Sequence, residues 1–448
     1  MTNRSREQPP ATVPRDTETK QAGHIRARWA WAEPAVWTNR MLTALETGVK
    51  GGKWFSLMDK VWSLPNLEMA FAKVRAKGGA AGCDHQTIAM FEARLEANLH
   101  SLSEQLRNET YRPQKIRRVY IPKPGSRETR PLGIPTVRDR TVQAALRQVI
   151  EPIFERDFAE QSYGFRPGRG CKDALRRVDA LLKTGHRHVV DADLKGYFDT
   201  IPHQPLLERV GDKITDGRVQ KLIESFLTQG VMDGLNEWTP ATGSPQGAVI
   251  SPLLSNLYLD PLDHLMAEAE IEMVRYADDY VIMCQNTEDA RVALDRVQRW
   301  TAAAGLQLHP DKTQIVDADQ QGFDFLGYHF RRGKRWPRGK STQKIKDTIR
   351  SKTPRQSGQS LPDIIASVNR TTRGWFEYFK HSTPESVFRS LDGRIRRRLR
   401  RILIKRQKIR RHSGLGSAHQ RWPNAFFAEH GLFSMEAAHV LARQSARR

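Results

Sequence analysis

Two short segments of the chain place acidic residues beside apolar residues that favour β-strands. The first is VVDADL (189–194) and the second is VRYADDYVI (274–282). In the second segment the flanking runs would pair as a hairpin, with the adjacent Asp278 and Asp279 at its tip. Two aspartates in a turn commonly do no more than shape the turn. Asp278 and Asp279 therefore indicate a functional site only in combination with other carboxylates that lie beside them.

Asp193 supplies that combination because it ends an apolar strand. If both segments belong to one sheet, Asp193 lies beside the hairpin tip. Carboxylates gathered in this way repel one another and raise each other's pKa unless a cation sits between them. Oxygen-only ligands suit Mg²⁺, which keeps water ligands and accepts substrate phosphates. Two such ions can activate a 3′-hydroxyl and stabilise a leaving pyrophosphate, so no protein nucleophile is needed.

The positive charge of the chain is concentrated in one segment. The 448 residues have a net charge of +23, and residues 331–411 alone hold 26 Lys and Arg against 5 Asp and Glu. Such a block attracts a polyanion through counterion release, although a solvated tail or an anionic membrane would also fit the charge. The helical spacing of Ile395, Leu399 and Ile402 favours a folded, mainly helical domain.

Composition and element order narrow the class of protein further. No apolar run approaches the roughly 18 residues that span a bilayer, and the first residues lack a secretory signal. Cys83, Cys171 and Cys284 lie far apart, which argues against a zinc ribbon or a disulfide framework and fits a reducing cytoplasm. Strands mix with helices without a long βαβ series, which favours an α+β domain with an antiparallel sheet.

The sequence around these carboxylates resembles the bacterial group II intron-encoded reverse transcriptases, which also act as maturases. Tyr276-Ala277-Asp278-Asp279 is the tetrapeptide of reverse transcriptases, and further blocks follow the family's order across about residues 40–330. These blocks are RRVYIPKP, RPLGIPTVRDRTVQAAL, SYGFRPGRGC, VVDADLKGYFDTI, GSPQGAVISPLLSNLYL, RYADDYV, HPDKT and FDFLGY. Because the cysteine pairs of the family's endonuclease are absent, the chain is similar to the class C members without that domain, and we expect no target-strand cleavage.

The resemblance implies a right-hand polymerase of the α+β class, followed by an α-helical basic thumb. The chain would then divide into a disordered N-terminus (1–25), an N-terminal helical extension (26–106), fingers and palm (107–330), a basic helical thumb or maturase domain (331–411) and a C-terminal DNA-binding-like region (412–448). The implied activities are RNA-directed DNA polymerisation, intron splicing and retrohoming in a bacterial cytoplasm. The implied partners are intron RNA, an RNA template with a DNA primer, target DNA and dNTPs, without a membrane.

The resemblance also assigns the metal ligands. Two Mg²⁺ ions would lie on Asp193 and Asp278, with the Leu194 carbonyl as a backbone ligand. Asp279 is expected to tune the site more than to bind strongly, although some members of the family use it as a ligand.

Contacts to the incoming nucleotide come from the fingers and from two palm motifs. Cationic side chains of the fingers would close over the triphosphate, and a glutamine–glycine pair would approach the sugar and the templating base. An aromatic residue after Asp193 would exclude a 2′-hydroxyl, with Phe198 as the first choice, Tyr197 as the second, and plain core packing as the alternative. The other residues are Arg117, Lys123, Arg130, Gln246 and Gly247.

Contacts to the nucleic acid strands come from three places. Arg166 and Gly168 would hold the template, with a loop that merely packs as an equal alternative. Lys312 would lie near the primer end, unless it is only a surface lysine. The basic thumb would grip duplex phosphates and read the shape of an A-form helix, through the residues Arg396, Arg397 and Arg398.

Two other functions compete with this interpretation. A splicing-only maturase with a silent polymerase site would commonly have lost one of the aspartates, and Asp193, Asp278 and Asp279 are all present. A domesticated reverse transcriptase in phage defence, or a retron enzyme, tends to be shorter and to lack a counterpart of residues 40–106.

Overall fold

A four-stranded antiparallel sheet carries the predicted carboxylates. The computed structural model describes residues 23–122, 129–407 and 415–445. Strand order in this palm sheet is β6-β7-β3-β8. The strands are β3 (His188–Asp193), β6 (Glu272–Tyr276), β7 (Asp279–Cys284) and β8 (Gln314–Asp317). Their Val, Ile and Tyr side chains favour a pleated, half-buried surface.

The two faces of the palm sheet belong to different hydrophobic cores because side chains alternate along each strand. Val190 lies in the core formed with α12 (Ser251–Glu268) and α13 (Thr287–Ala303). Val189 lies in a second core that includes residues of α8 (Cys171–Lys183) and of the thumb. Asp193 has the same parity as Val189, so the acidic cluster lies on the thumb-facing side of the sheet.

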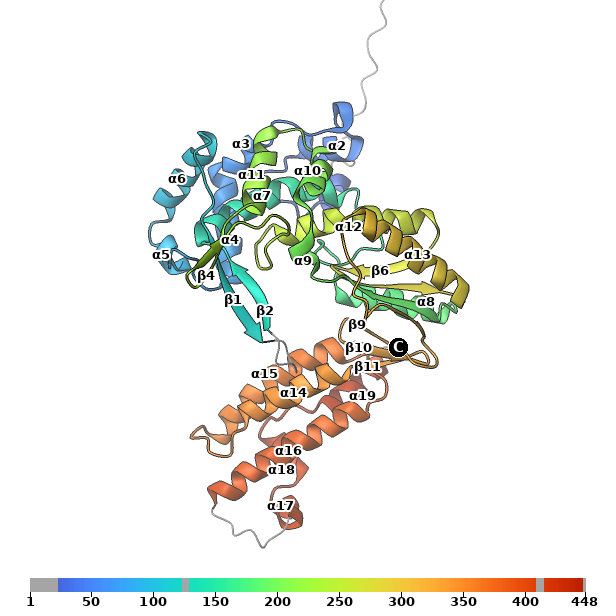
Figure 1. Ribbon diagram of the computed structural model, residues 1–448. Coiled ribbons are helices and arrows are strands. Elements are labelled where there is room, and N and C mark those ends of the chain that lie inside the picture. Colours follow the sequence, from blue (N-terminus) through green and yellow to red (C-terminus); the bar gives the residue numbers. More distant parts are fainter. Residues whose placement is uncertain (1–22, 123–128, 408–414, 446–448) are drawn as a thin grey trace, which may run out of the picture.

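The fingers are a second small sheet of strand order β2-β1-β4-β5. Strands β1 (Ile116–Pro122) and β2 (Thr129–Ile134) form the expected hairpin, and β4 (Val231–Asp233) and β5 (Asn236–Trp238) form another. Figure 1 shows the β1–β2 hairpin reaching toward the thumb helices. Between β3 and β4 lie three helices, α9 (Tyr197–Thr200), α10 (His203–Gly211) and α11 (Gly217–Leu227).

Helices of the N-terminal extension share their core with the fingers and the palm. The long, largely buried α7 (Val137–Glu155) is the centre of this packing, and α4 lies along it. Trp37 lies in the same core and its indole donates to the Gln148 carbonyl of α7 (3.0 Å). The extension is therefore continuous with the fingers and palm. Its elements are α2 (Asn39–Thr47), η1 (Lys50–Gly52), α3 (Met58–Trp62), α4 (Leu64–Lys77), α5 (Ile88–Glu92) and α6 (Leu95–Arg107).

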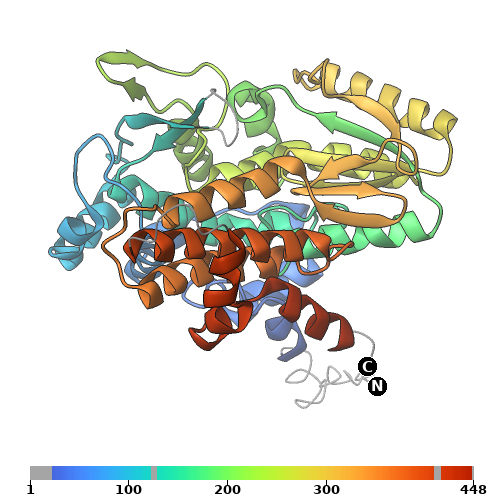
Figure 2. The same ribbon diagram turned by 90° about the horizontal axis from the view of Figure 1, so that it is seen from below.

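The thumb was expected at 331–411; the name is used below for the described residues 323–407 and 415–445, which begin with a three-stranded sheet and continue as helices. The strands are β9 (Phe323–Phe325), β10 (Tyr328–Arg331) and β11 (Lys334–Pro337). The long helices α14 (Gly339–Lys352), α15 (Leu361–Phe379) and α16 (Ser386–Arg406) pack side by side, as the view from below shows (Figure 2). Buried Phe376, Phe388 and Leu399 hold them together, so most of the aromatic run at 375–379 is core.

Three short helices complete the thumb. These are α17 (Leu415–Arg421), α18 (Asn424–Glu429) and α19 (Met435–Ser445). Trp422, Phe427 and Met435 are buried in the thumb core, so the described part of the segment expected as a separate DNA-binding-like region (412–448) is packed onto the thumb. No helix in the described part of the chain is long and apolar enough to cross a membrane.

Candidate active site and nucleic-acid interface

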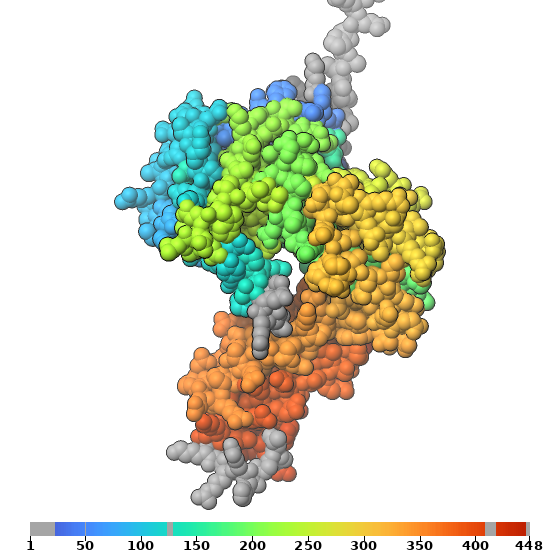
Figure 3. Space-filling view, in the orientation of Figure 1, coloured from blue at the N-terminus to red at the C-terminus, as the bar shows by residue number. Residues whose placement is uncertain are grey.

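The predicted carboxylates converge where β3 and β7 end. Asp193 pairs with Asp279 as the last residue pair of these two antiparallel strands, and Tyr276 pairs with Asp279 across the hairpin. Residues directly opposite in an antiparallel pair have their side chains on the same face. Asp278 stands in the two-residue turn between β6 and β7. Figure 3 shows a hollow between the fingers, palm and thumb.

The electrostatics of this cluster are those of negative charge held in partly desolvated surroundings. Burial and the nearby Asp193 raise the pKa of Asp278, while Arg130 of the fingers lowers it. Asp279 is exposed at the strand end, yet desolvation of its carboxyl and the neighbouring Asp191 and Asp278 raise its pKa to about 7. Each carboxylate disfavours ionisation of the others, so a cation placed among them would be stabilised.

The donor set fits a hard divalent cation that is only partly bound by protein. Within the described residues, no group of three or more His, Cys, Asp or Glu side chains is arranged to hold a metal ion by itself. Mg²⁺ commonly takes one or two carboxylates and completes its shell with water and substrate phosphate. Asp193 and Asp278 are suited to that role. The backbone carbonyl of Asp193 already accepts a hydrogen bond from His309 N (2.7 Å). The next backbone oxygen along the chain is the Leu194 carbonyl, the expected backbone ligand.

Asp191 is a carboxylate that the sequence did not single out as a site residue. It lies on the same face of β3 as Asp193, and burial together with Asp324 and Asp193 raises its pKa to about 6. Asp324 belongs to β9 and Arg338 caps the start of α14, and both act on this cluster. The base of the thumb therefore contributes charge to the site.

Lys312 reaches the cluster across 119 positions of sequence. Its Nζ lies 2.5 Å from Asp193 Oδ2, in a pair that is open to solvent on both sides. The lysine offsets one negative charge at the position where a cation is expected. The structure thus places Lys312 at the acidic cluster.

The two candidates for the sugar gate occupy different surroundings. Tyr197 is buried and its hydroxyl donates to the Ser255 carbonyl (2.7 Å). The second choice is therefore corrected: Tyr197 is a core residue of α9, with no ring face open to a nucleotide. Phe198 packs edge-on against it and lines a cavity of about 440 Å³ next to the fingers. Phe198 remains the candidate gate.

The same cavity brings together the fingers and the motif Ser244-Pro245-Gln246-Gly247. Gly133 of β2 donates to the Gln246 carbonyl (2.7 Å). A Cβ on Gly247 would lie 2.4 Å from the Gly133 carbonyl oxygen, and Gly247 has φ +107°. Glycine is thus required there by both contact and conformation, and Gln246 is fixed at the cavity wall.

Arg118 and Trp238 also line this cavity and were not expected from the sequence. The guanidinium of Arg118 lies 5.2 Å from the ring centroid of Trp238, a cation–π distance. Their positions on β1 and β5 become neighbours only when β4 and β5 join the fingers sheet, so no local pattern could indicate the pair.

Of the three cationic residues expected to contact the triphosphate, the structure describes Arg117 and Arg130. Arg130 ends the exposed part of β2 and is close enough to lower the pKa of Asp278. Arg117 donates to the Ala81 carbonyl (2.6 Å) in the loop after α4, which directs it toward the N-terminal extension. Lys123 lies outside the described residues.

Arg166 is not placed to hold a template. It is buried and forms an ion pair with Glu155 (2.9 Å). Its guanidinium also donates to the carbonyls of Ala159 (2.5 Å) and Ser162 (2.9 Å). The expected template contact is therefore corrected: Arg166 fastens its own loop to the end of α7, because a guanidinium with all of these partners is not available to phosphate.

Neighbouring residues of the same loop do face solvent. Gly168 is exposed and has φ +71°. Phe165 is 44% exposed although its backbone has φ +59°, and its ring centroid lies 6.2 Å from that of Tyr276. An exposed aromatic ring beside the YADD turn was missed by sequence reasoning, which assigned the loop's contact to its charged residue.

The three thumb arginines also differ. Arg397 is exposed on α16, and Arg396 is half-buried. Arg398 instead donates to the carbonyls of Arg350 (3.1 Å) and Thr353 (2.7 Å) at the end of α14. These bonds satisfy carbonyls that a helix end leaves without partners. Arg398 is thus committed to fastening α16 to α14, which corrects its assignment as a free phosphate contact.

Comparisons with known proteins agree with the geometry of the site. Residues 121–330 match the family described as reverse transcriptase (RNA-dependent DNA polymerase), and residues 342–422 match the group II intron maturase-specific domain. The chain is similar to protein YkfC of Escherichia coli, with 32% identity over 382 residues that cover 76% of this chain and 95% of YkfC.

Two relatives have names that refer to introns. Group II intron-encoded protein LtrA of Lactococcus lactis is 37% identical over 186 residues, which cover 42% of this chain and 31% of LtrA. A putative COX1/OXI3 intron 1 protein of Saccharomyces cerevisiae is 25% identical over 370 residues, which cover 70% of this chain and 43% of that protein.

Proposed function

Since this chain belongs to the group II intron-encoded reverse transcriptases with a maturase domain, we propose that it extends a DNA primer on an RNA template by two-metal nucleotidyl transfer. The observation that carries the proposal is the pairing of Asp193 with Asp279 beside Asp278. We assign the two Mg²⁺ ions to Asp193, Asp278 and the Leu194 carbonyl. Bound there, they would lower the pKa of the primer hydroxyl and offset charge on the leaving pyrophosphate.

The remaining residues of the site bind and orient the nucleotide. Phe198 forms the floor under the sugar and excludes a 2′-hydroxyl, while Gln246 and Gly247 fix the cavity wall beside it. Arg130 of β2 and Lys123 offset the triphosphate charge. Asp279 and Asp191 tune the charge of the cluster. Lys312 keeps Asp193 paired while no cation is bound.

The thumb binds the duplex and, as the maturase domain, the intron RNA. Exposed Arg397 and half-buried Arg396 contribute phosphate contacts, which carry affinity without base readout. We propose that the chain supports splicing of its own intron RNA and its retrohoming into target DNA. RNA that co-purifies with the protein, sequenced after mild nuclease trimming, should contain an intron ribozyme. If it consists of random cellular RNA, the proposed maturase function is wrong.

Metal binding can be tested without turnover. A complex with RNA template, a DNA primer ending in a dideoxynucleotide and the matching dNTP cannot react. Electron paramagnetic resonance with Mn²⁺ should count two bound ions per complex, and fewer in Asp193→Asn and Asp278→Asn. Glu288→Gln, at the exposed start of α13, serves as the control for loss of one negative charge. An unchanged count in both aspartate variants would contradict the assignment of the metal ligands.

A further inference from the structure

The residue just before Asp278 has an unfavourable backbone conformation, which other contacts must stabilise. Ala277 has φ +60°, in the left-handed region that residues with a Cβ rarely occupy. Such conformations persist where the surrounding contacts over-determine them. The turn is short, so the direction of the Asp278 carboxyl follows from how the Ala277 peptide is held.

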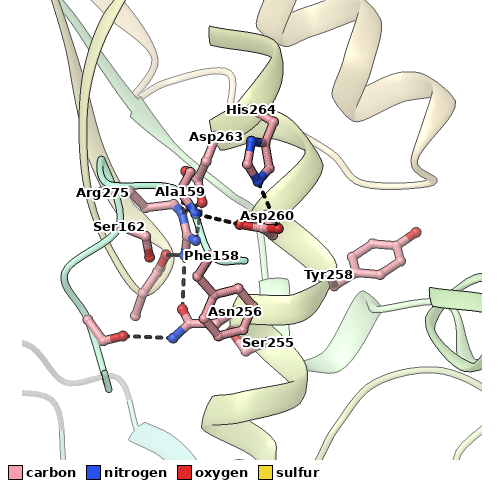
Figure 4. A network of polar contacts seen from close by, with 12 residues as sticks. Phe158, Ala159, Ser162, Ser255, Asn256, Tyr258, Asp260, Asp263, His264 and Arg275 are labelled. Atoms are coloured by element: carbon pink, nitrogen blue, oxygen red, sulfur yellow. Dashed lines mark hydrogen bonds and ion pairs between the residues drawn. The ribbon is translucent and has the colours of Figure 1, made fainter. Parts of the chain in front are cut away.

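One buried arginine contacts this peptide from inside the protein. Arg275 is fully buried, and its Nη1 donates to the Ala277 carbonyl (2.9 Å) and to Asn256 Oδ1 (3.0 Å). Its Nε donates to both carboxyl oxygens of Asp263 (2.8 and 3.0 Å), and Nη2 also pairs with Asp263. Figure 4 shows Asp263 and Asn256 reaching Arg275 from the same helix, α12. The buried charge is thus compensated, and one nitrogen remains directed at the turn.

Asn256 connects the same arginine to a second segment. Its Nδ2 donates to the Gly164 carbonyl (2.7 Å), in the loop fastened by Arg166. A Cβ on Gly164 would lie 2.3 Å from Ala277 N, so loop and turn are in backbone contact. Gly164 does not have a positive φ, which means that close approach alone requires a glycine there.

The loop is also joined to β6 by backbone hydrogen bonds. Arg275 N donates to the Gln161 carbonyl (2.9 Å), and Tyr163 N donates to the Arg275 carbonyl (2.8 Å). Arg275 is therefore the residue at which the loop, α12 and the catalytic turn meet. If Arg275 only joined β6 to α12, its ion pair with Asp263 would be enough. Its Nη1 makes two further contacts, one to the Ala277 carbonyl in the turn and one to Asn256, the side chain that holds Gly164.

We infer that Arg275, with Asn256 and Asp263, is a positioning element that fixes the Ala277 peptide and thereby the carboxyl of Asp278. Arg275 does not reach the cleft, so it acts through the turn and not on substrate. The inference rests on the proposed role of Asp278. It assigns the polar residues of α12 to the geometry of catalysis, in addition to the stability of the fold.

The test uses two variants that disturb the turn while leaving the ion pair with Asp263 in place, and a third that replaces the arginine itself. Asn256→Ala removes both amide links, and Gly164→Ala pushes directly on Ala277 N. Arg275→Lys retains a positive charge but cannot reach Asp263, Asn256 and Ala277 together. Arg400→Lys is the matched control, because Arg400 is also a buried arginine (1% exposed) but contacts the Trp422 carbonyl and Asn424 in the thumb.

The expected result is a loss of rate that is separate from a loss of folding or binding. In single-turnover primer extension at saturating substrate, Asn256→Ala and Gly164→Ala should lower the maximal rate by about 10- to 100-fold, since a displacement near 1 Å can have that effect. Their duplex Kd and dNTP KM should stay within about twofold of the parent. Mn²⁺ affinity of the unreactive complex should fall in parallel with the rate. Arg400→Lys should lower the Tm and leave the maximal rate unchanged.

Opposite results are distinguishable. If Asp278→Asn is inactive while Asn256→Ala and Gly164→Ala, shown by circular dichroism to be folded, keep the parent rate and Mn²⁺ affinity, the positioning role is wrong and the site assignment stands. If the rate falls only in proportion to the unfolded fraction, as a structural role requires, the inference is equally overturned. If Asp278→Asn itself retains full activity, the proposed site fails instead.

Discussion

Asp193 and Asp279 face each other as the terminal pair of β3 and β7, although they are 86 positions apart in the chain. The pairing places both carboxyls on the side of the palm sheet that faces the thumb. Asp278 follows in the turn, held at Ala277 by Arg275. This one register brings together the acidic residues of two separate motifs, and the account of the active site depends on it.

The assignment of Phe198 as the gate predicts a change in sugar selection. Phe198→Val removes most of the ring under the nucleotide and should reduce discrimination against ribonucleotides by about 10- to 100-fold, the range for a changed apolar contact in a pocket. The ratio of kcat/KM for a dNTP and its rNTP measures this. Tyr163→Phe is a control that changes an aromatic residue of the palm outside this cavity. Unchanged selection in Phe198→Val would place the gate elsewhere.

The raised pKa of Asp191 predicts a pH-dependent stability. Because burial, Asp324 and Asp193 raise this pKa to about 6, the native state holds the proton more tightly than the unfolded chain. This group therefore costs no stability below its ordinary pKa near 4, and its cost grows as the pH rises through 6. Asp191→Asn should raise the Tm at pH 8, by an amount that shrinks toward pH 5.

Thermal melts without divalent ions at several pH values would measure this difference. Asp311→Asn is a matched control, because Asp311 lies on an exposed loop. A Tm difference for Asp191→Asn that is constant between pH 5 and pH 8 would mean that Asp191 has an ordinary pKa in the native protein.

The two neighbouring arginines of α16 should respond to neutralisation in different ways. Arg397→Gln should reduce the slope of log Kd for an RNA–DNA duplex against log salt by about 0.9, the amount for one phosphate contact. Arg398→Gln should leave the slope unchanged and lower the free energy of unfolding by about 1–3 kcal/mol, because carbonyls of α14 lose a charged donor. Filter binding across a salt series and chemical denaturation measure the two effects; equal slopes for Arg397→Gln and the parent would place the duplex elsewhere on the thumb.

The sequence predicted the parts of the site that local pattern determines. Asp193, Asp278 and Asp279 were found because each ends or interrupts a short apolar strand, and the α+β fold followed from the same strands and from the family resemblance. Phe198 and Tyr197 are adjacent aromatic residues in the sequence, and nothing local indicated that Tyr197 would be buried against α12 with its hydroxyl on Ser255.

The residues that were misjudged depend on long-range contacts. Arg166 has the sequence context of a loop cation, but Glu155 and the carbonyls before it use all of its donors. Arg397 and Arg398 are neighbours in one basic run of the sequence. They differ only because Arg398 donates hydrogen bonds to carbonyls at the end of α14. Arg275 and Asp263 lie on different elements, and their pairing appears only once β6 packs on α12. A charge pattern in the sequence therefore identifies a basic surface, but it does not show which of its side chains are used in contacts within the protein.

The central claim, that Asp278 is part of the catalytic metal site, is tested most directly by single-turnover extension of a DNA primer on an RNA template by Asp278→Asn. We expect a rate reduced by on the order of 1,000-fold or more at saturating Mg²⁺ and dNTP, with duplex Kd within about twofold of the parent because the thumb supplies most phosphate contacts. Primer extension at the parent rate by a folded Asp278→Asn protein would contradict it.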